Sequence, residues 1–167
     1  KMNLFLIGFV SSSVQLLLMR EIMNISGGYE LISGIFLGAW LAGSALGARL
    51  AFKSKLKDVR KINLIFSVSP LLSVLLMFIL ARLFLTAGET PLFLAATIYT
   101  FLVLLPFCLV SGFTFVKLVM AARSGDAIHP GDSFSRETAG GVASGVLISI
   151  FTAGLLNTYQ LLVPLIL

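Results

Sequence analysis

Charged side chains are scarce in this chain of 167 residues, where they make up 11% of the total. Soluble domains carry about one quarter charged residues. Hydrophobic residues make up 58% of the chain, and its mean hydropathy is +1.06. A water-soluble core of this size cannot hide so much apolar surface, whereas lipid allows apolar side chains to face outward. The composition therefore excludes an ordinary soluble domain and predicts an integral membrane protein.

Cysteine and histidine are nearly absent, since Cys108 and His129 are the single residues of their types. One cysteine excludes a disulfide framework within the chain. One histidine cannot provide two axial ligands to a haem, and zinc sites need clusters of Cys and His. We therefore expect no metal and no cofactor to be held by this chain alone.

Sequence motifs of catalysis are also missing. The chain has no G-x-G-x-x-G after a strand pattern, no P-loop, no nucleophile elbow, no H-E-x-x-H and no C-x-x-C. Its acidic residues are too few and too scattered for a catalytic carboxylate pair. The net charge of +5 comes from basic residues between apolar runs, which is typical of membrane topology signals and not of nucleic-acid binding. We expect neither an enzyme nor a nucleic-acid partner.

Five apolar segments are long enough to cross a bilayer as helices, for which roughly 20 residues are needed. They are continuous apolar runs without the alternation of a membrane β-strand, so the predicted fold is an all-α polytopic bundle in one transmembrane domain. The expected helices cover residues 3–23, 30–52, 62–85, 91–121 and 139–156. The apolar residues from 159 onward predict the start of a sixth helix, so we expect the natural protein to be longer.

Basic residues set the expected orientation. Lys and Arg are concentrated in residues 49–61 and 117–138. Because Lys- and Arg-rich connections stay in the cytoplasm, both segments and the N-terminus are expected on that side.

Small residues form two groups on the expected helices. They are Gly34, Gly38, Gly43 and Gly47 in the second segment and Gly141 and Gly145 in the fifth. Glycines four residues apart let two helix backbones approach closely in lipid. This pattern predicts helix packing, either static or as a surface on which helices rock.

Polar residues near the first hairpin are candidates for a binding site. Gln15, Arg20 and Glu21 lie in the first segment, and Glu30 opens the second after a short Gly-rich turn. Charges at this depth are costly and usually functional or paired. One interpretation is a polar pocket facing outward, and the other is interfacial snorkelling with an Arg–Glu pair that fastens the hairpin.

The longest polar stretch precedes the fifth segment and contains His129, Arg136 and Glu137. We interpret it as a cytoplasmic connector. It is either a solvated loop or a docking or gating element next to the small-residue helix.

Residues 15–47, QLLLMREIMNISGGYELISGIFLGAWLAGSALG, resemble the membrane region of bacterial spermidine-synthase-like proteins. The motifs that carry the resemblance are Arg20–Glu21, the turn before Glu30, and Trp40–Leu41, with Tyr29 where the family has Asn. Two further matches are SRETAGGVASGVLISIFTAGLLNTYQ at residues 135–160 and SGFTF at residues 111–115, which lacks the family's proline.

The resemblance implies a location in the bacterial inner membrane and a topology distantly like half of a major-facilitator transporter. Proteins of that family join the membrane region to a soluble aminopropyltransferase-like domain. The glycine-rich loop and acidic residues of that domain have no counterpart in this chain. Aminopropyl transfer is therefore assigned to none of its residues.

Three functions are compatible with the sequence. The first is a membrane anchor or subunit, whose partners are lipid and either other membrane subunits or a C-terminal part of the same protein. The second is a transporter-like module for a cationic substrate such as a polyamine, bound by Gln15, Glu21 and Glu30. The third is a quinone-side subunit of a redox complex.

Overall fold

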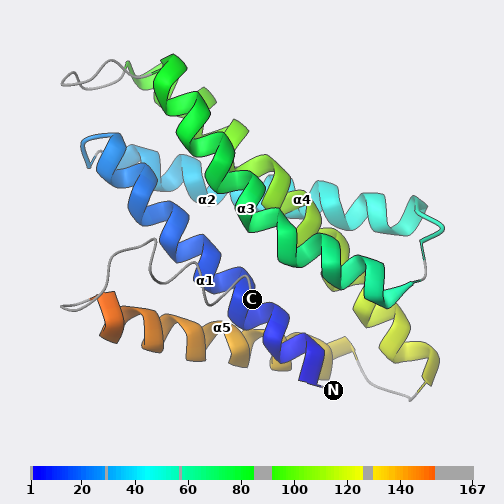
Figure 1. The fold of residues 1–167 in the computed structure, drawn as a ribbon. Helices are drawn as coiled ribbons and strands as arrows, with labels where there is room; N and C mark the ends of the chain where they lie inside the picture. Colours follow the sequence, from blue (N-terminus) through cyan, green and yellow to red (C-terminus); the bar gives the residue numbers. More distant parts are fainter. Residues whose placement is uncertain (1, 29, 57, 85–91, 126–129, 153–167) are drawn as a thin grey trace.

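The computed structural model describes residues 2–28, 30–56, 58–84, 92–125 and 130–152 (Figure 1). This part of the chain is helical and contains no strand, which confirms the predicted all-α class. Its helices are α1 (Met2–Ile25), α2 (Glu30–Lys53), α3 (Val59–Phe84), α4 (Phe93–Gly125) and α5 (Pro130–Thr152).

Helix α5 begins at Pro130, more than two turns before the expected start at residue 139. Proline is favoured in the first turn of a helix, and Asp132 in that turn suits the positive end of the helix dipole. Arg136 and Glu137, expected in a connector, are therefore helical residues. His129 and the expected sixth segment from 159 lie outside the described residues.

Four of the described helices are long and apolar enough to cross a membrane, whereas the sequence predicts five spans. The candidate spans are Leu4–Ile25, Glu30–Lys53, Val59–Leu83 and Phe93–Ala121. Helix α5 is not among them. Its first two turns carry Asp132, Arg136 and Glu137, which shorten the uncharged part of the described helix.

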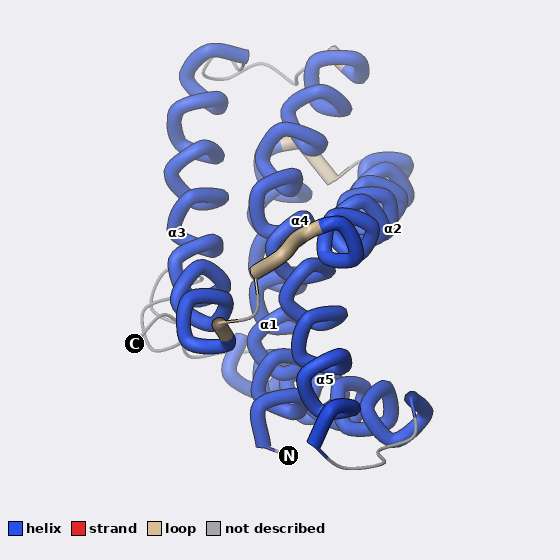
Figure 2. The backbone as a smooth tube through the Cα atoms, turned by 90° about the vertical axis from the view of Figure 1, so that its right-hand side faces the viewer, coloured by secondary structure: helices blue, strands red, loops and turns tan. Residues whose placement is uncertain are grey.

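The helices run in two directions. Helices α1, α3 and α4 lie along a common direction, and α2 and α5 cross it (Figures 1 and 2). Helix α4 packs most extensively against α2 and α3, whereas α5 packs against α1. Helix α1 makes far fewer contacts with α2 and α4. The described chain therefore consists of an α2–α3–α4 group and an α1–α5 pair.

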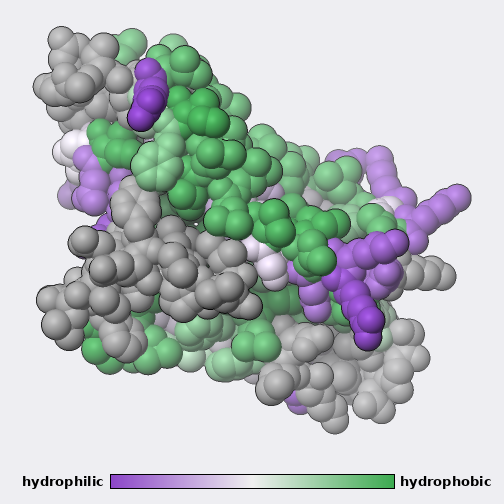
Figure 3. Space-filling model, in the orientation of Figure 1, coloured by the Kyte–Doolittle hydropathy of each residue, from purple (hydrophilic) through white to green (hydrophobic). Residues whose placement is uncertain are grey.

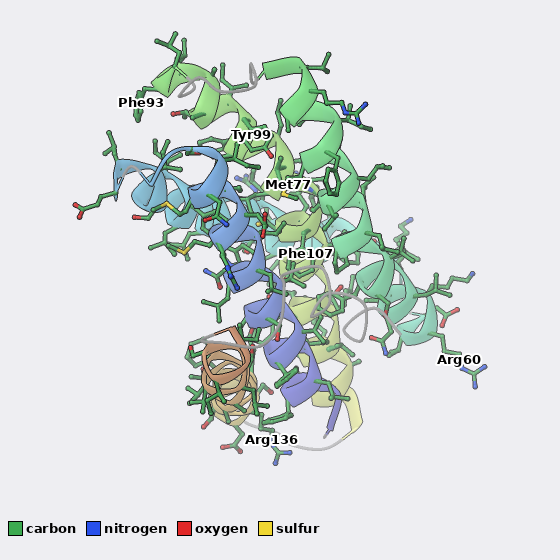
Figure 4. The ribbon with its side chains drawn as sticks, turned by 60° about the vertical axis from the view of Figure 1, so that its left-hand side comes forward. Arg60, Met77, Phe93, Tyr99, Phe107 and Arg136 are labelled. Atoms are coloured by element: carbon green, nitrogen blue, oxygen red, sulfur yellow. The ribbon has the colours of Figure 1, made fainter. Side chains whose placement is uncertain are left out.

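Aromatic side chains join the three helices of the larger group. The Phe107 ring on α4 lies 5.5 Å from the Trp40 ring on α2 and 5.9 Å from the Phe66 ring on α3, between centroids. Trp40 also stacks on Phe36 at 6.2 Å. Tyr99 donates a hydrogen bond from its hydroxyl to the Met77 carbonyl, at 3.3 Å (Figure 4). Tilted and offset ring pairs of this kind add specific stabilisation to the area that they bury.

Local sequence signals fix two of the helix ends. Gly27 and Gly28 have φ values of 73° and 78°, and the Gly28 N–H donates to the Met23 carbonyl, which closes α1 with a Schellman motif. At the start of α3, Asp58 accepts a hydrogen bond from the Arg60 N–H at 3.1 Å and acts as the N-cap. Both features follow from residue types that are visible in the sequence.

The outer surface of the helices is apolar. Figure 3 shows hydrophobic side chains over the middle of the molecule and hydrophilic ones concentrated at the end where α2 meets α3. Leu83 and Leu92 are 73% and 75% exposed, and similar residues are exposed on every described helix. An apolar surface of this extent suits contact with lipid chains.

Candidate functional site

Glycines bring α2 and α4 into backbone contact. A Cβ atom added at Gly47 would overlap the Leu109 carbonyl, and one added at Gly112 would overlap the Ser44 carbonyl. A Cβ on Gly43 would lie 2.7 Å from the Cβ of Cys108, which is itself buried. Each helix therefore presents a glycine to the backbone of the other.

The α1–α5 contact repeats this arrangement. A Cβ added at Gly8 would overlap the Glu137 carbonyl, and one added at Gly140 would overlap the Phe5 carbonyl. A Cβ at Gly141 would lie 2.7 Å from the Ser12 hydroxyl oxygen. In both contacts, each helix provides one glycine and one backbone carbonyl. The carbonyl belongs to the residue three positions before that glycine.

The glycines named from the sequence thus divide into two groups. Gly43, Gly47 and Gly141 lie at helix contacts. Gly34, Gly38 and Gly145 face open space among the described residues. The sequence does not single out Gly8, Gly112 and Gly140, because none of them has a second glycine four residues away.

Three consecutive serines of α1 point to different neighbours. The Ser11 hydroxyl lies 2.9 Å from the Ser111 hydroxyl on α4, and the Ser13 hydroxyl lies 2.7 Å from the Ser144 hydroxyl on α5. Successive residues of a helix are turned by about 100°, so positions two apart face nearly opposite sides. This geometry lets α1 contact α4 through Ser11 and α5 through Ser13. Ser12 lies between these two serines on the helix.

A polar cleft of about 390 Å³ opens beside Ser12. Its polar lining combines Gln15 of α1 with Glu137 and Thr138 of α5, and Trp40 of α2 forms an apolar wall. Glu137 is half-buried and Trp40 is buried. The cleft therefore offers a carboxylate, an amide, hydroxyls and an indole face, a combination that suits a cation.

The structure places the hairpin residues elsewhere. Of the four predicted site residues, Gln15 lines the cleft, and Arg20, Glu21 and Glu30 do not. Gln15 and Arg20 are turned apart by roughly 140° on the helix, so they face different sides of α1. Among the described residues no ion pair joins Arg20 to Glu21 or Glu30. The carboxylate beside Gln15 is instead Glu137, for which the sequence predicts a position in the cytoplasmic connector.

Burial against α1 raises the pKa of the Glu137 carboxyl above its ordinary value, because the charged form loses solvation. The folded chain consequently binds this proton more tightly than the unfolded chain does. Stability is then highest below the ordinary glutamate pKa and falls as the pH rises through the raised value. Ionised Glu137 is thus a destabilising group unless something compensates its charge.

We expect Glu137→Gln to raise the unfolding temperature at neutral pH and to remove this pH dependence. The neutral amide keeps the shape of the side chain without the cost of a buried charge. Thermal unfolding in mild detergent, followed from acid to neutral pH, measures the effect. Glu30→Gln, at an exposed position on α2, is the matched control and should change little. If the unfolding temperature of the wild type changed with pH in parallel with that of Glu137→Gln, the prediction would be contradicted.

No protein family, curated protein or solved structure matches this chain.

Proposed function

We propose that this chain is an integral membrane module of a larger membrane assembly, in which further protein covers the cleft between α1 and α5. The four apolar helices are compatible with an integral membrane module. The observation that favours an assembly is the open cleft with half-buried Glu137. A carboxylate beside membrane helices is costly when it faces lipid, and such groups usually face protein or water.

The covering protein belongs either to another subunit or to a further part of the same polypeptide. The resemblance to the membrane region of spermidine-synthase-like proteins supports the same proposal, because there the membrane helices are part of a longer chain. On this proposal the basic end near the α2–α3 connection lies in the cytoplasm, following the positive-inside rule.

A photo-crosslinking amino acid at position 142 tests the proposal in native membranes. Val142 lines the cleft and is 63% exposed. We expect this probe to give a protein adduct, within the full-length polypeptide or with another one. The same probe at Leu75, which is 56% exposed on α3, is the control and should react mainly with lipid. Lipid adducts alone at both positions would contradict the proposal.

A second candidate function is binding of a cationic substrate, such as a polyamine, in the same cleft. It is favoured by the grouping of Glu137, Gln15 and Trp40, which provides charge, hydrogen bonding and an aromatic face. Bound cations compensate the carboxylate, so spermidine should stabilise the wild type and not Glu137→Gln in the thermal series above. Equal stabilisation of both would exclude this candidate.

A further inference from the structure

A second cavity, of about 440 Å³, lies at the opposite group of helices, where α2 ends and α3 begins. Its walls come from Phe52 and Ser54, from Val59 and Ile62, and from Met120 near the end of α4. Most of this lining is apolar. The cavity is separate from the cleft between α1 and α5 and shares none of its residues.

Among the described residues that line this cavity, Lys117 is the one with a charge. Its ammonium group donates a 2.6 Å hydrogen bond to the Ser54 carbonyl and lies 5.6 Å from the centroid of the Phe113 ring. Among the described residues no carboxylate forms an ion pair with it. An ammonium group has three N–H donors. A half-buried cation with spare donors, and with no counter-charge in the described part of the chain, therefore lines an apolar cavity.

The chain segment that provides one side of the cavity is strongly basic. The segment from Arg49 to Lys61 carries six basic side chains and one carboxylate, whereas the rest of the chain carries six of each, so the whole net charge of +5 lies in this segment. Its one acid, Asp58, already caps α3 and lies 4.0 Å from Lys61. Figure 4 shows Arg60 at this outer end of α3, directed away from the bundle. The surrounding field therefore attracts an anion.

Exposed apolar side chains also line the cavity. Phe52 and Leu56 line the cavity and are 70% and 42% exposed. They lie at the ends of apolar spans, where lipid headgroups meet lipid chains. A free phosphate ion makes no use of such surfaces, whereas a phospholipid places its phosphate near the cations and its first chain carbons on apolar groups.

We propose that this cavity binds an anionic phospholipid, with its phosphate at Lys117 and its upper acyl carbons against Phe52 and Met120, while the basic segment 49–61 attracts the lipid by its overall charge. The site explains why a half-buried lysine, with no acidic partner among the described side chains, lines an apolar cavity. It also gives the concentrated positive charge a role beyond orientation, because the lipid would fasten the α2–α3 connection to α4.

Native mass spectrometry of the full chain with defined lipids tests the proposal. We expect phosphatidylglycerol to be retained in preference to phosphatidylcholine, and inorganic phosphate to compete poorly. One basic group near a membrane surface contributes about 1 kcal/mol, so Lys117→Gln should weaken phosphatidylglycerol binding about fivefold. Lys117→Arg should keep most of the binding, since it keeps the charge.

Lys61→Gln is the charge-matched control, because Lys61 belongs to the same basic segment but does not line the cavity. If the lipid were held only by general attraction to positive charge, Lys61→Gln and Lys117→Gln would weaken phosphatidylglycerol binding equally. That result would overturn the proposal. Met120→Trp fills the cavity without changing the charge, and it should also displace the lipid. Full lipid retention by this variant, or equal binding of inorganic phosphate, would likewise overturn it.

Discussion

Gly47→Ala is expected to destabilise the α2–α4 contact by about 1–3 kcal/mol, the usual cost of overpacking a filled interior. The added methyl group would overlap the Leu109 carbonyl, which is helix backbone and cannot turn aside as a flexible side chain does. The two helices must separate to accept it. That movement also disturbs the neighbouring contact between Gly43 and Cys108.

Cys108 provides the measurement, because it is the single cysteine and is fully buried in this contact. A thiol-reactive dye should label it at a lower temperature in Gly47→Ala than in the wild type. Gly38→Ala is the matched control on the same helix, where nothing lies within 4 Å of the new methyl group. Alanine is the better helix former by roughly 0.5–1 kcal/mol, so this variant should match or exceed the wild type. An equal fall of the labelling temperature in Gly47→Ala and Gly38→Ala would contradict the prediction.

Gly140→Ala should loosen α5 from α1 while leaving the α2–α4 contact intact. The new methyl group would overlap the Phe5 carbonyl, again a backbone atom, with an expected cost of about 1–3 kcal/mol. Because α5 packs mainly against α1, the loss should appear as local opening and not as global unfolding.

Hydrogen exchange measured by mass spectrometry separates these two outcomes. In Gly140→Ala, peptides from α5 should exchange faster, and the labelling temperature of Cys108 should stay near the wild-type value. Gly145→Ala is the control on the same helix, since Gly145 has open space around it, and it should leave α5 exchange unchanged. Faster exchange in α4 as well would show that the two helix groups are more tightly coupled than the contacts between them indicate.

Much of the helical architecture could be predicted from the sequence. The starts and ends of α1, α2, α3 and α4 agree with the apolar runs to within a few residues, apart from the end of α4 at Gly125. These runs are long, and backbone groups in lipid must bond within each helix, so length and hydropathy are strong signals there. For α5 the sequence predicts a start at residue 139, which is too late, because the first turns of this helix are polar and polar stretches between apolar runs are typical of loops.

The candidate site could be predicted only in part. Gln15 was identified as a polar residue within an apolar helix, and it does line the cleft. Its carboxylate neighbour was expected in the adjacent hairpin, from Glu21 or Glu30, on the basis of short sequence separation. Glu137 approaches instead from a helix more than one hundred residues later, through the contact of Gly8 with its backbone.

The sequence by itself determined that this chain forms helices apolar enough to cross a membrane, where the first four of them lie, and where the net positive charge is concentrated. The tertiary structure alone decided which helices pair, which glycines are at contacts, and that Gln15 and Glu137 share a cleft. The physical reason is that these helices are apolar on nearly every side. Hydropathy then cannot distinguish a face that meets lipid from one that meets another helix, and backbone fit decides the pairing.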